Sequence, residues 1–326
     1  MDYVTQVNEA LRTELTAREM TVVYGQNVNA GSRLGGLSQD FSSILGCRVI
    51  NTPNTENSLI GMGFGLMLSG IASMYVMKQQ DFVLLGVDHL VNTWNALRSR
   101  GPFVPFVIAM IVVDSGWEGP QSGFNNTGAL ASMSRIPAYF PTGEAEIPLA
   151  VAGAFGGGPA ILAISQRLFR TNPNEASGVP VTVATDSYVV RTFPGEAGSS
   201  RSLLVLSSNF SLAQASLIRD AMLGVGESVT VISFFKYVEH ADELLLSLCA
   251  KADTILGIDD AKSTRNVILG ICADIRSRLP STQITTMIRG DAPDWAFPQE
   301  DRLKVDLEGL ESTVRLPSWS TPRSYF

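Results

Sequence analysis

The sequence predicts an α/β protein built from two doubly wound domains, the first with a mainly parallel sheet. Short apolar runs alternate with segments of helical spacing, which is typical of parallel strands covered by helices. Hydrophobic residues make up 45% of the chain, charged residues 17%, and 29 residues are glycine, a composition that favours buried strands. The length of 326 residues fits two domains better than one. We place them at residues 1–175 and 196–326, with a linker at 176–195.

The elements of the first domain follow from periodicity. Val4, Val7, Leu11 and Leu15 recur at helical spacing, so a helix with one apolar face opens the chain. A Gly- and Asn-rich loop at 25–36 is expected to be exposed. Strands are then expected at residues 21–24, 47–51, 71–77, 104–114 and 160–165, and helices at 57–70 and 82–98. This order predicts a parallel sheet with helices on both faces.

The second domain begins after a stretch rich in Asn, Pro, Glu, Ser and Gly at residues 170–178. The same rhythm of strands and helices then returns, which predicts a smaller doubly wound domain. Its strands are expected at 203–207, 228–234, 254–258 and 283–287, and its helices at 211–223, 241–250 and 264–278.

Composition argues against several classes of protein. The net charge is −7 and the basic residues are not clustered, which is unlike a nucleic-acid-binding surface. The longest apolar run, at 104–113, is about half the length of a membrane span. Residues 1–20 are amphipathic and charged, unlike a signal peptide, so we expect a cytoplasmic protein without membrane contacts. The low charged fraction fits either a surface covered by a partner subunit or simply a large core.

The stretch from Asn51 to Gly61 is the most informative about chemistry. It combines the end of a strand, a polar loop, the carboxylate of Glu56 and the start of a glycine-bearing helix. Glu56 therefore lies near the carboxyl end of a parallel strand, where open α/β sheets bind ligands. A carboxylate in a first helical turn also stabilises the helix dipole by about 0.3–1 kcal/mol. On these residues alone, a capping role and a ligand-binding role both remain open.

The pattern T-P-x-x-E-x-x-x-x-G, which begins at Thr52, resembles the signature of beta subunits of thiamine-diphosphate-dependent pyruvate and branched-chain 2-oxo acid dehydrogenases. Transketolases share the same pyrimidine-binding domain. The stretch from Asp81 to Arg98 resembles the D-F-x-x-x-x-x-D-Q-I-V-N helix of these subunits, and the half from Leu203 onward resembles the transketolase C-terminal domain. The resemblance covers nearly the whole chain, in order.

The resemblance implies a pyrimidine-binding domain followed by a transketolase C-terminal-like domain. It implies that Glu56 is catalytic: its desolvated carboxyl bonds a pyrimidine nitrogen of thiamine diphosphate and shares a proton near neutral pH. Phe82 is the candidate to pack on the pyrimidine ring, although it also suits an ordinary core position. Gln26 and Thr55 are further candidates for binding the cofactor.

The part of the family that anchors the diphosphate and magnesium is missing here. No G-D-G motif occurs, and the nearest string is Gly290-Asp291-Ala292. The resemblance therefore implies an alpha-type partner that carries this motif and the metal site. It also implies a heterotetramer of two alpha and two beta subunits, in which two copies of this chain meet.

The sequence departs from the family at the site. Ser122 replaces a loop histidine, Gln26 and Asn27 replace two carboxylates, and Gln79 and its neighbour stand where an aromatic residue is usual. Serine cannot shuttle protons near neutral pH as imidazole does. We therefore expect Gln121, Ser122 and Gln79 to face the substrate, a 2-oxo acid or ketose. These changes favour ketol or acyl transfer over a 2-oxo acid dehydrogenase.

A non-catalytic scaffold or regulatory subunit is the alternative. The lost histidine and carboxylates motivate it, whereas the retention of Glu56 in its full sequence context counts against it. His89 replaces the glutamine of the D-Q-I-V-N pattern, where a role at a subunit contact is favoured over catalysis.

Overall fold

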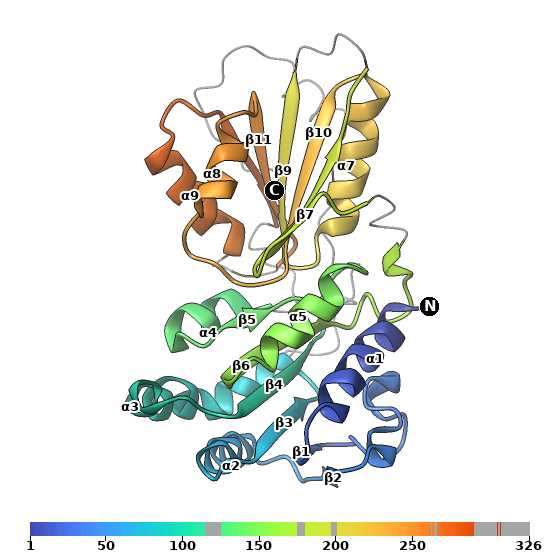
Figure 1. Ribbon diagram of the computed structural model, residues 1–326, viewed down its shortest axis with the longest axis vertical. Coiled ribbons are helices and arrows are strands. Elements are labelled where there is room, and N and C mark those ends of the chain that lie inside the picture. Colours follow the sequence, from blue (N-terminus) through green and yellow to red (C-terminus); the bar gives the residue numbers. More distant parts are fainter. Residues whose placement is uncertain are drawn as a thin grey trace. The chain divides into compact units, whose positions relative to one another are not determined.

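A computed structural model describes residues 1–114, 125–174, 180–196, 201–261, 263, 266–289, 305 and 307. The chain divides into two compact units, which meet in the sequence at Pro173 and Asn174. Each unit contains a six-stranded, mainly parallel sheet covered by helices (Figure 1). The predicted fold class of two doubly wound α/β domains is therefore confirmed.

The sheet of the first unit is parallel throughout, in the order β2-β1-β3-β4-β6-β5. The central strands β3, β4 and β6 are almost wholly buried, which explains their continuous apolar sequences. The expected strands are all present, and only the two-residue β5 was missed. The strands are β1 Thr21–Gly25, β2 Cys47–Asn51, β3 Ala72–Met77, β4 Pro105–Val112, β5 Ala138–Tyr139 and β6 Gly158–Ser165.

Helices cover both faces of this sheet (Figure 1). Helix α1 (Tyr3–Thr16) begins at Asp2, whose carboxylate accepts a hydrogen bond from the Thr5 N–H, and packs beside α5 (Glu146–Ala154). Helix α2 (Glu56–Leu68) lies on the other face of the sheet, together with α4 (Thr127–Ser134). Helices α4 and α5 were not predicted from the sequence.

The single helix expected at residues 82–98 was wrong. The chain instead forms a 3₁₀ segment η3 (Gln80–Gly86), a π-helical turn η4 (His89–Thr93), the short α3 (Trp94–Leu97) and a 3₁₀ turn η5 (Arg98–Arg100). Close packing on α2 explains this, because a Cβ added to Gly86 would lie 2.5 Å from Ile60 Cδ1. The tertiary contact, rather than helix propensity, sets the backbone here.

The second unit has the strand order β12-β11-β9-β10-β8-β7. β8 pairs antiparallel with β10 and with β7, while the other pairs are parallel. Its strands are β7 Val183–Ala184, β8 Tyr188–Phe193, β9 Ser202–Ser208, β10 Ser228–Phe234, β11 Thr254–Asp259 and β12 Ile284–Ile288, and its helices are α7 Leu212–Gly224, α8 Glu243–Cys249 and α9 Val267–Arg278.

The stretch 176–195, which we expected to be a linker, contains β7 and β8. The apolar run of β8 is short and is interrupted by Arg191, so its sequence does not resemble a buried strand. Arg191 is nevertheless only 1% exposed, because β8 completes the sheet beside β10. Pairing with a distant strand, invisible in local periodicity, therefore decides this element.

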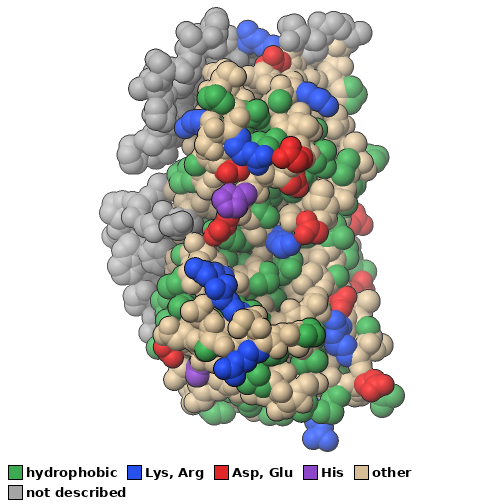
Figure 2. Space-filling model, turned by 60° about the vertical axis from the view of Figure 1, so that its left-hand side comes forward, with side chains coloured by type: hydrophobic (Ala, Val, Ile, Leu, Met, Phe, Trp, Pro, Cys, Tyr) green, Lys and Arg blue, Asp and Glu red, His purple; other side chains and the backbone are tan. Residues whose placement is uncertain are grey.

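The described surface is mixed in character. On the face shown in Figure 2, acidic and basic side chains alternate with apolar ones. No helix in the described ranges is both long and apolar enough to cross a membrane. Within these ranges the three cysteines are free thiols, with Cys249 and Cys272 buried and Cys47 partly so.

Candidate functional site

The site lies at the point where the strand order of the first sheet reverses. From β1 the chain moves outward to β2, and then returns to place β3 on the other side of β1. Such a switch point leaves a crevice beyond the carboxyl ends of the strands. Gln26 follows β1, Glu56 comes shortly after β2, and Lys78 follows β3. The topology thus brings these three side chains to one edge of the sheet.

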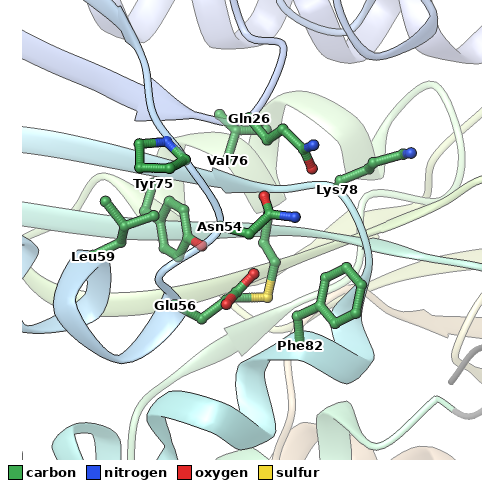
Figure 3. A pocket seen from close by; sticks show the side chains of 10 residues that line it. Gln26, Asn54, Glu56, Leu59, Tyr75, Val76, Lys78 and Phe82 are labelled. Carbon is green, nitrogen blue, oxygen red and sulfur yellow. The ribbon is translucent and has the colours of Figure 1, made fainter.

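A pocket occupies this edge (Figure 3). It contains about 220 Å³ of empty space, part of it open to solvent. Its lining residues are Gln26, Pro53, Asn54, Glu56, Leu59, Tyr75, Val76, Met77, Lys78 and Phe82.

Gly25 positions the next residue, Gln26, at the pocket. It ends β1 with a φ of +150°, and an added Cβ would lie 2.2 Å from the carbonyl oxygen of Val76 on β3. Only glycine accepts both this backbone conformation and this approach. The close pairing of β1 and β3 therefore sets where the next residue, Gln26, can lie.

Glu56 provides the carboxylate of the pocket. It is the first residue of α2 and is only 7% exposed. In the described part of the chain, no side chain or N–H group donates a hydrogen bond to its carboxylate, and no cation pairs with it. Figure 3 shows the carboxylate between Tyr75 and Phe82, facing the pocket. A buried carboxylate without a partner is costly, which points to a ligand that supplies one.

Close packing of α2 on the sheet holds Glu56 in place. A Cβ added to Gly63 would lie 2.1 Å from the ring of Phe106 on β4 and 2.6 Å from the Tyr24 hydroxyl. That hydroxyl donates to the carbonyl oxygen of Leu59, 2.9 Å away on α2. These contacts hold α2 against β1 and β4.

Tyr75 forms the floor beside Glu56 and was not singled out from the sequence. Its ring stacks on Tyr24, with centroids 5.2 Å apart and planes 5° from parallel. Burial raises the pKa of the Tyr75 hydroxyl, and the nearby charge of Glu56 raises it further. Tyr75 is therefore a neutral aromatic wall at physiological pH. In the sequence it looks like any apolar strand residue.

Phe82 and Asp81 lie on η3. Phe82 is partly buried and lines the pocket, as Figure 3 shows. One carboxyl oxygen of the neighbouring Asp81 is buried without a hydrogen-bond partner among the described residues. Burial raises the pKa of Asp81 to about 6. This carboxyl is not among the lining residues.

A buried hydrogen-bond network ties η3 to the start of α4. The Gln80 side chain, 1% exposed, donates to the Thr127 hydroxyl and accepts from the Asn126 N–H at 2.9 Å. The Thr127 hydroxyl in turn donates to Asn125 Oδ1 at 2.7 Å. Sequence reasoning missed this link, since the partners lie more than 40 positions apart.

The remaining predicted site residues lie elsewhere. Thr55 is exposed just before α2 and does not line the pocket, and Gln79 is partly buried just before η3, also away from the lining. Gln121 and Ser122 lie outside the described residues. His89 is partly buried on η4, and its Nδ1 lies 2.9 Å from the Thr93 hydroxyl. Of the predicted set, the structure thus brings together Gln26, Glu56 and Phe82, and it adds Asn54, Tyr75 and Lys78.

Several known proteins are similar to this chain in sequence or in fold. No family model matches the chain. The pyruvate dehydrogenase E1 component subunit beta of Bacillus subtilis is 20% identical over 309 residues, which cover 91% of each protein. A mitochondrial 2-oxoisovalerate dehydrogenase subunit beta from Chaetomium thermophilum is 29% identical over 100 residues, 31% of this chain and 21% of that protein. A solved structure described as a split gene transketolase, inactive beta4 tetramer, has a TM-score of 0.60 at 13% identity, covering 88% of this chain and 89% of that one.

The chain is similar over most of its length to the Bacillus pyruvate dehydrogenase beta subunit, in an alignment that runs through both units. It shares the fold of the split transketolase. The described pocket lies in the first unit and includes Glu56, the residue that the T-P-x-x-E pattern singled out.

Proposed function

We propose that this chain is the pyrimidine-binding beta subunit of a two-subunit enzyme that uses thiamine diphosphate. The enzyme would make or break a carbon–carbon bond next to a carbonyl group. The observation that carries this proposal is Glu56: a carboxylate only 7% exposed, unpartnered among the described residues, in a pocket at the switch point of a parallel sheet.

The residues of the pocket fit the heterocyclic end of such a cofactor. Glu56 would accept a hydrogen bond from a ring N–H and exchange that proton, as a general acid–base requires. Phe82 would pack against the ring, opposite the aromatic wall made by Tyr75. When bound, thiamine diphosphate supplies an electron sink for the carbon next to the carbonyl. The fit explains why a carboxylate is left without a protein partner.

The missing G-D-G motif also supports a shared cofactor. The described pocket has a single basic residue, Lys78, and a single acidic residue, Glu56, among its lining residues. We propose that an alpha-type subunit binds the diphosphate and magnesium, and that the cofactor lies at the alpha–beta contact. Exposed apolar side chains on α2 and η3 offer a surface for a partner: Met62 at 38%, Leu84 at 54% and Leu85 at 64% exposure.

Association of two copies of this chain is part of the same proposal. The split transketolase of similar fold is described as an inactive tetramer of beta chains. A beta chain of this kind thus assembles with itself without forming an active enzyme. We expect this chain to pair with a second copy and to gain activity only with its alpha-type partner, as a heterotetramer.

For the reaction, we favour ketol or acyl transfer over oxidative decarboxylation. Ser122 stands where the resembling subunits carry a histidine, and the two carboxylates near β1 are replaced by Gln26 and Asn27. The relatives over the whole chain are named pyruvate dehydrogenase subunits, so decarboxylation of a 2-oxo acid is the competing reaction. Products made from a 2-oxo acid and from a ketose by the purified complex distinguish the two.

The experiment is calorimetric titration of thiamine diphosphate with magnesium into this chain alone and into its complex with the alpha-type partner. We expect binding only in the complex. Glu56→Gln keeps the size of the side chain but removes its acid–base function, so turnover should fall about 10²–10⁴-fold. Glu9→Gln, on the exposed side of α1, is the matched control and should change nothing.

Two outcomes would contradict the proposal. Undiminished turnover in the Glu56→Gln complex would show that this carboxylate does not activate the cofactor. The absence of thiamine diphosphate binding by both the chain and the complex would favour the alternative of a non-catalytic scaffold.

A further inference from the structure

Lys78 is the feature of the pocket that the proposed role of Glu56 does not use. It is the first residue after β3, so it lies at the carboxyl end of a strand that borders the switch point. Among the ten residues that line the pocket, it is the only base and Glu56 the only acid. The two opposite charges therefore belong to one small pocket.

The ammonium group has no partner in the described part of the chain. It makes no salt bridge or hydrogen bond there, although Lys236 and several arginines do. The side-chain amides of Gln26 and Asn54 are likewise free of hydrogen bonds within the described residues. Figure 3 shows the polar ends of these three side chains on one side of the pocket, with the Glu56 carboxylate and the Phe82 ring below them.

The two sides of the pocket thus suit two different kinds of ligand group. Glu56 calls for a hydrogen-bond donor, which the ring of the proposed cofactor supplies. Lys78 and Asn54 are exposed and Gln26 is partly buried, so their polar ends are open to solvent and to a ligand. The ammonium has three donors and no acceptor. A carboxylate or phosphate would bind it with charge-assisted hydrogen bonds, which a neutral ligand cannot form.

We propose that Lys78, assisted by the amides of Gln26 and Asn54, binds an anionic group of the substrate, a carboxylate or a phosphate, beside the cofactor ring. This inference rests on the proposed function and deepens it, because it names a specificity-determining residue for the carbonyl substrate. A substrate with such a group would be oriented by two points, the anion at Lys78 and the carbonyl at the reacting carbon.

The test uses the complex with the alpha-type partner, saturated with thiamine diphosphate and magnesium. Oxamate serves as an unreactive probe for a 2-oxo carboxylate, and inorganic phosphate as the probe for a phosphate. Each is titrated calorimetrically into wild type, Lys78→Ala, Lys78→Arg and the matched control Lys251→Ala. Lys251 is an exposed lysine of the second unit, so its removal changes the net charge equally.

We expect Lys78→Ala to weaken one of the two probes about fivefold, which corresponds to about 1 kcal/mol and is typical of an ion pair made by an exposed side chain such as Lys78. The probe that responds identifies the carboxylate or the phosphate as the group bound. Lys78→Arg and Lys251→Ala should remain within about twofold of wild type. Thiamine diphosphate affinity should be the same in all four proteins.

Equal affinities of Lys78→Ala and Lys251→Ala for both probes would overturn the inference. So would a loss of thiamine diphosphate affinity in Lys78→Ala, because the ammonium would then serve the cofactor itself. If the wild-type complex took up no thiamine diphosphate, the proposed function would fail instead. Phosphate and oxamate titrated into the wild-type chain and Lys78→Ala would still decide whether Lys78 binds an anion.

Discussion

Replacement of Gln80 by methionine is the sharpest test of how the pocket is held together. Methionine keeps the length and volume of the side chain but can form neither of its two hydrogen bonds, to the Thr127 hydroxyl and from the Asn126 N–H. Each lost bond costs about 1 kcal/mol, and an N–H group left unsatisfied adds about 1 kcal/mol or more. We therefore expect Gln80→Met to destabilise the first unit by about 2–4 kcal/mol.

Thermal unfolding followed by calorimetry measures this loss. For a unit of this size, about 1 kcal/mol lowers Tm by about 2–4 °C, so the transition of the first unit should fall by about 4–16 °C. Gln39→Met is the matched control, because Gln39 is exposed and, among the described residues, its side-chain amide bonds only the neighbouring Asp40. Its transition should stay within about 2 °C of wild type. A Gln80→Met protein as stable as the Gln39→Met protein would refute the network as a structural element.

Two other perturbations probe the same unit. Gly63→Ala should destabilise it by about 1–3 kcal/mol in denaturant unfolding, since the new methyl group would meet the Phe106 ring. Gly65→Ala on the same helix has no atom within 4 Å of the added Cβ and should stabilise the unit by about 0.5–1 kcal/mol. The opposite ranking would contradict the described packing of α2. Burial raises the pKa of Asp81 to about 6, above the value of about 3.9 in an unfolded chain, so its contribution to stability declines as pH rises from about 4 to 6. The free energy of unfolding of Asp81→Asn should therefore rise relative to that of wild type over that pH range, by on the order of 1 kcal/mol after solvent screening of this partly exposed group. An equal pH dependence of stability in the two proteins would show that Asp81 titrates normally.

The sequence by itself determined the fold class and the location of Glu56. Strands such as β4 and β6 are buried on both faces, so their side chains must all be apolar and the run is visible without a structure. Helix α1 shows its buried face through residues three and four positions apart. The T-P-x-x-E pattern after β2 placed Glu56 at the end of a parallel strand, which the topology bears out.

The tertiary structure alone decided which other residues join Glu56. Tyr75 and Lys78 come from the end of β3 and Gln26 from the end of β1, and only the reversal of strand order makes them neighbours. The irregular course of η3 likewise follows from its packing on α2. The antiparallel strand β8 follows from its pairing with β10. Periodicity reports how one element divides its residues between core and solvent, whereas the contacts between elements depend on where the chain crosses and returns, which no short stretch of sequence encodes.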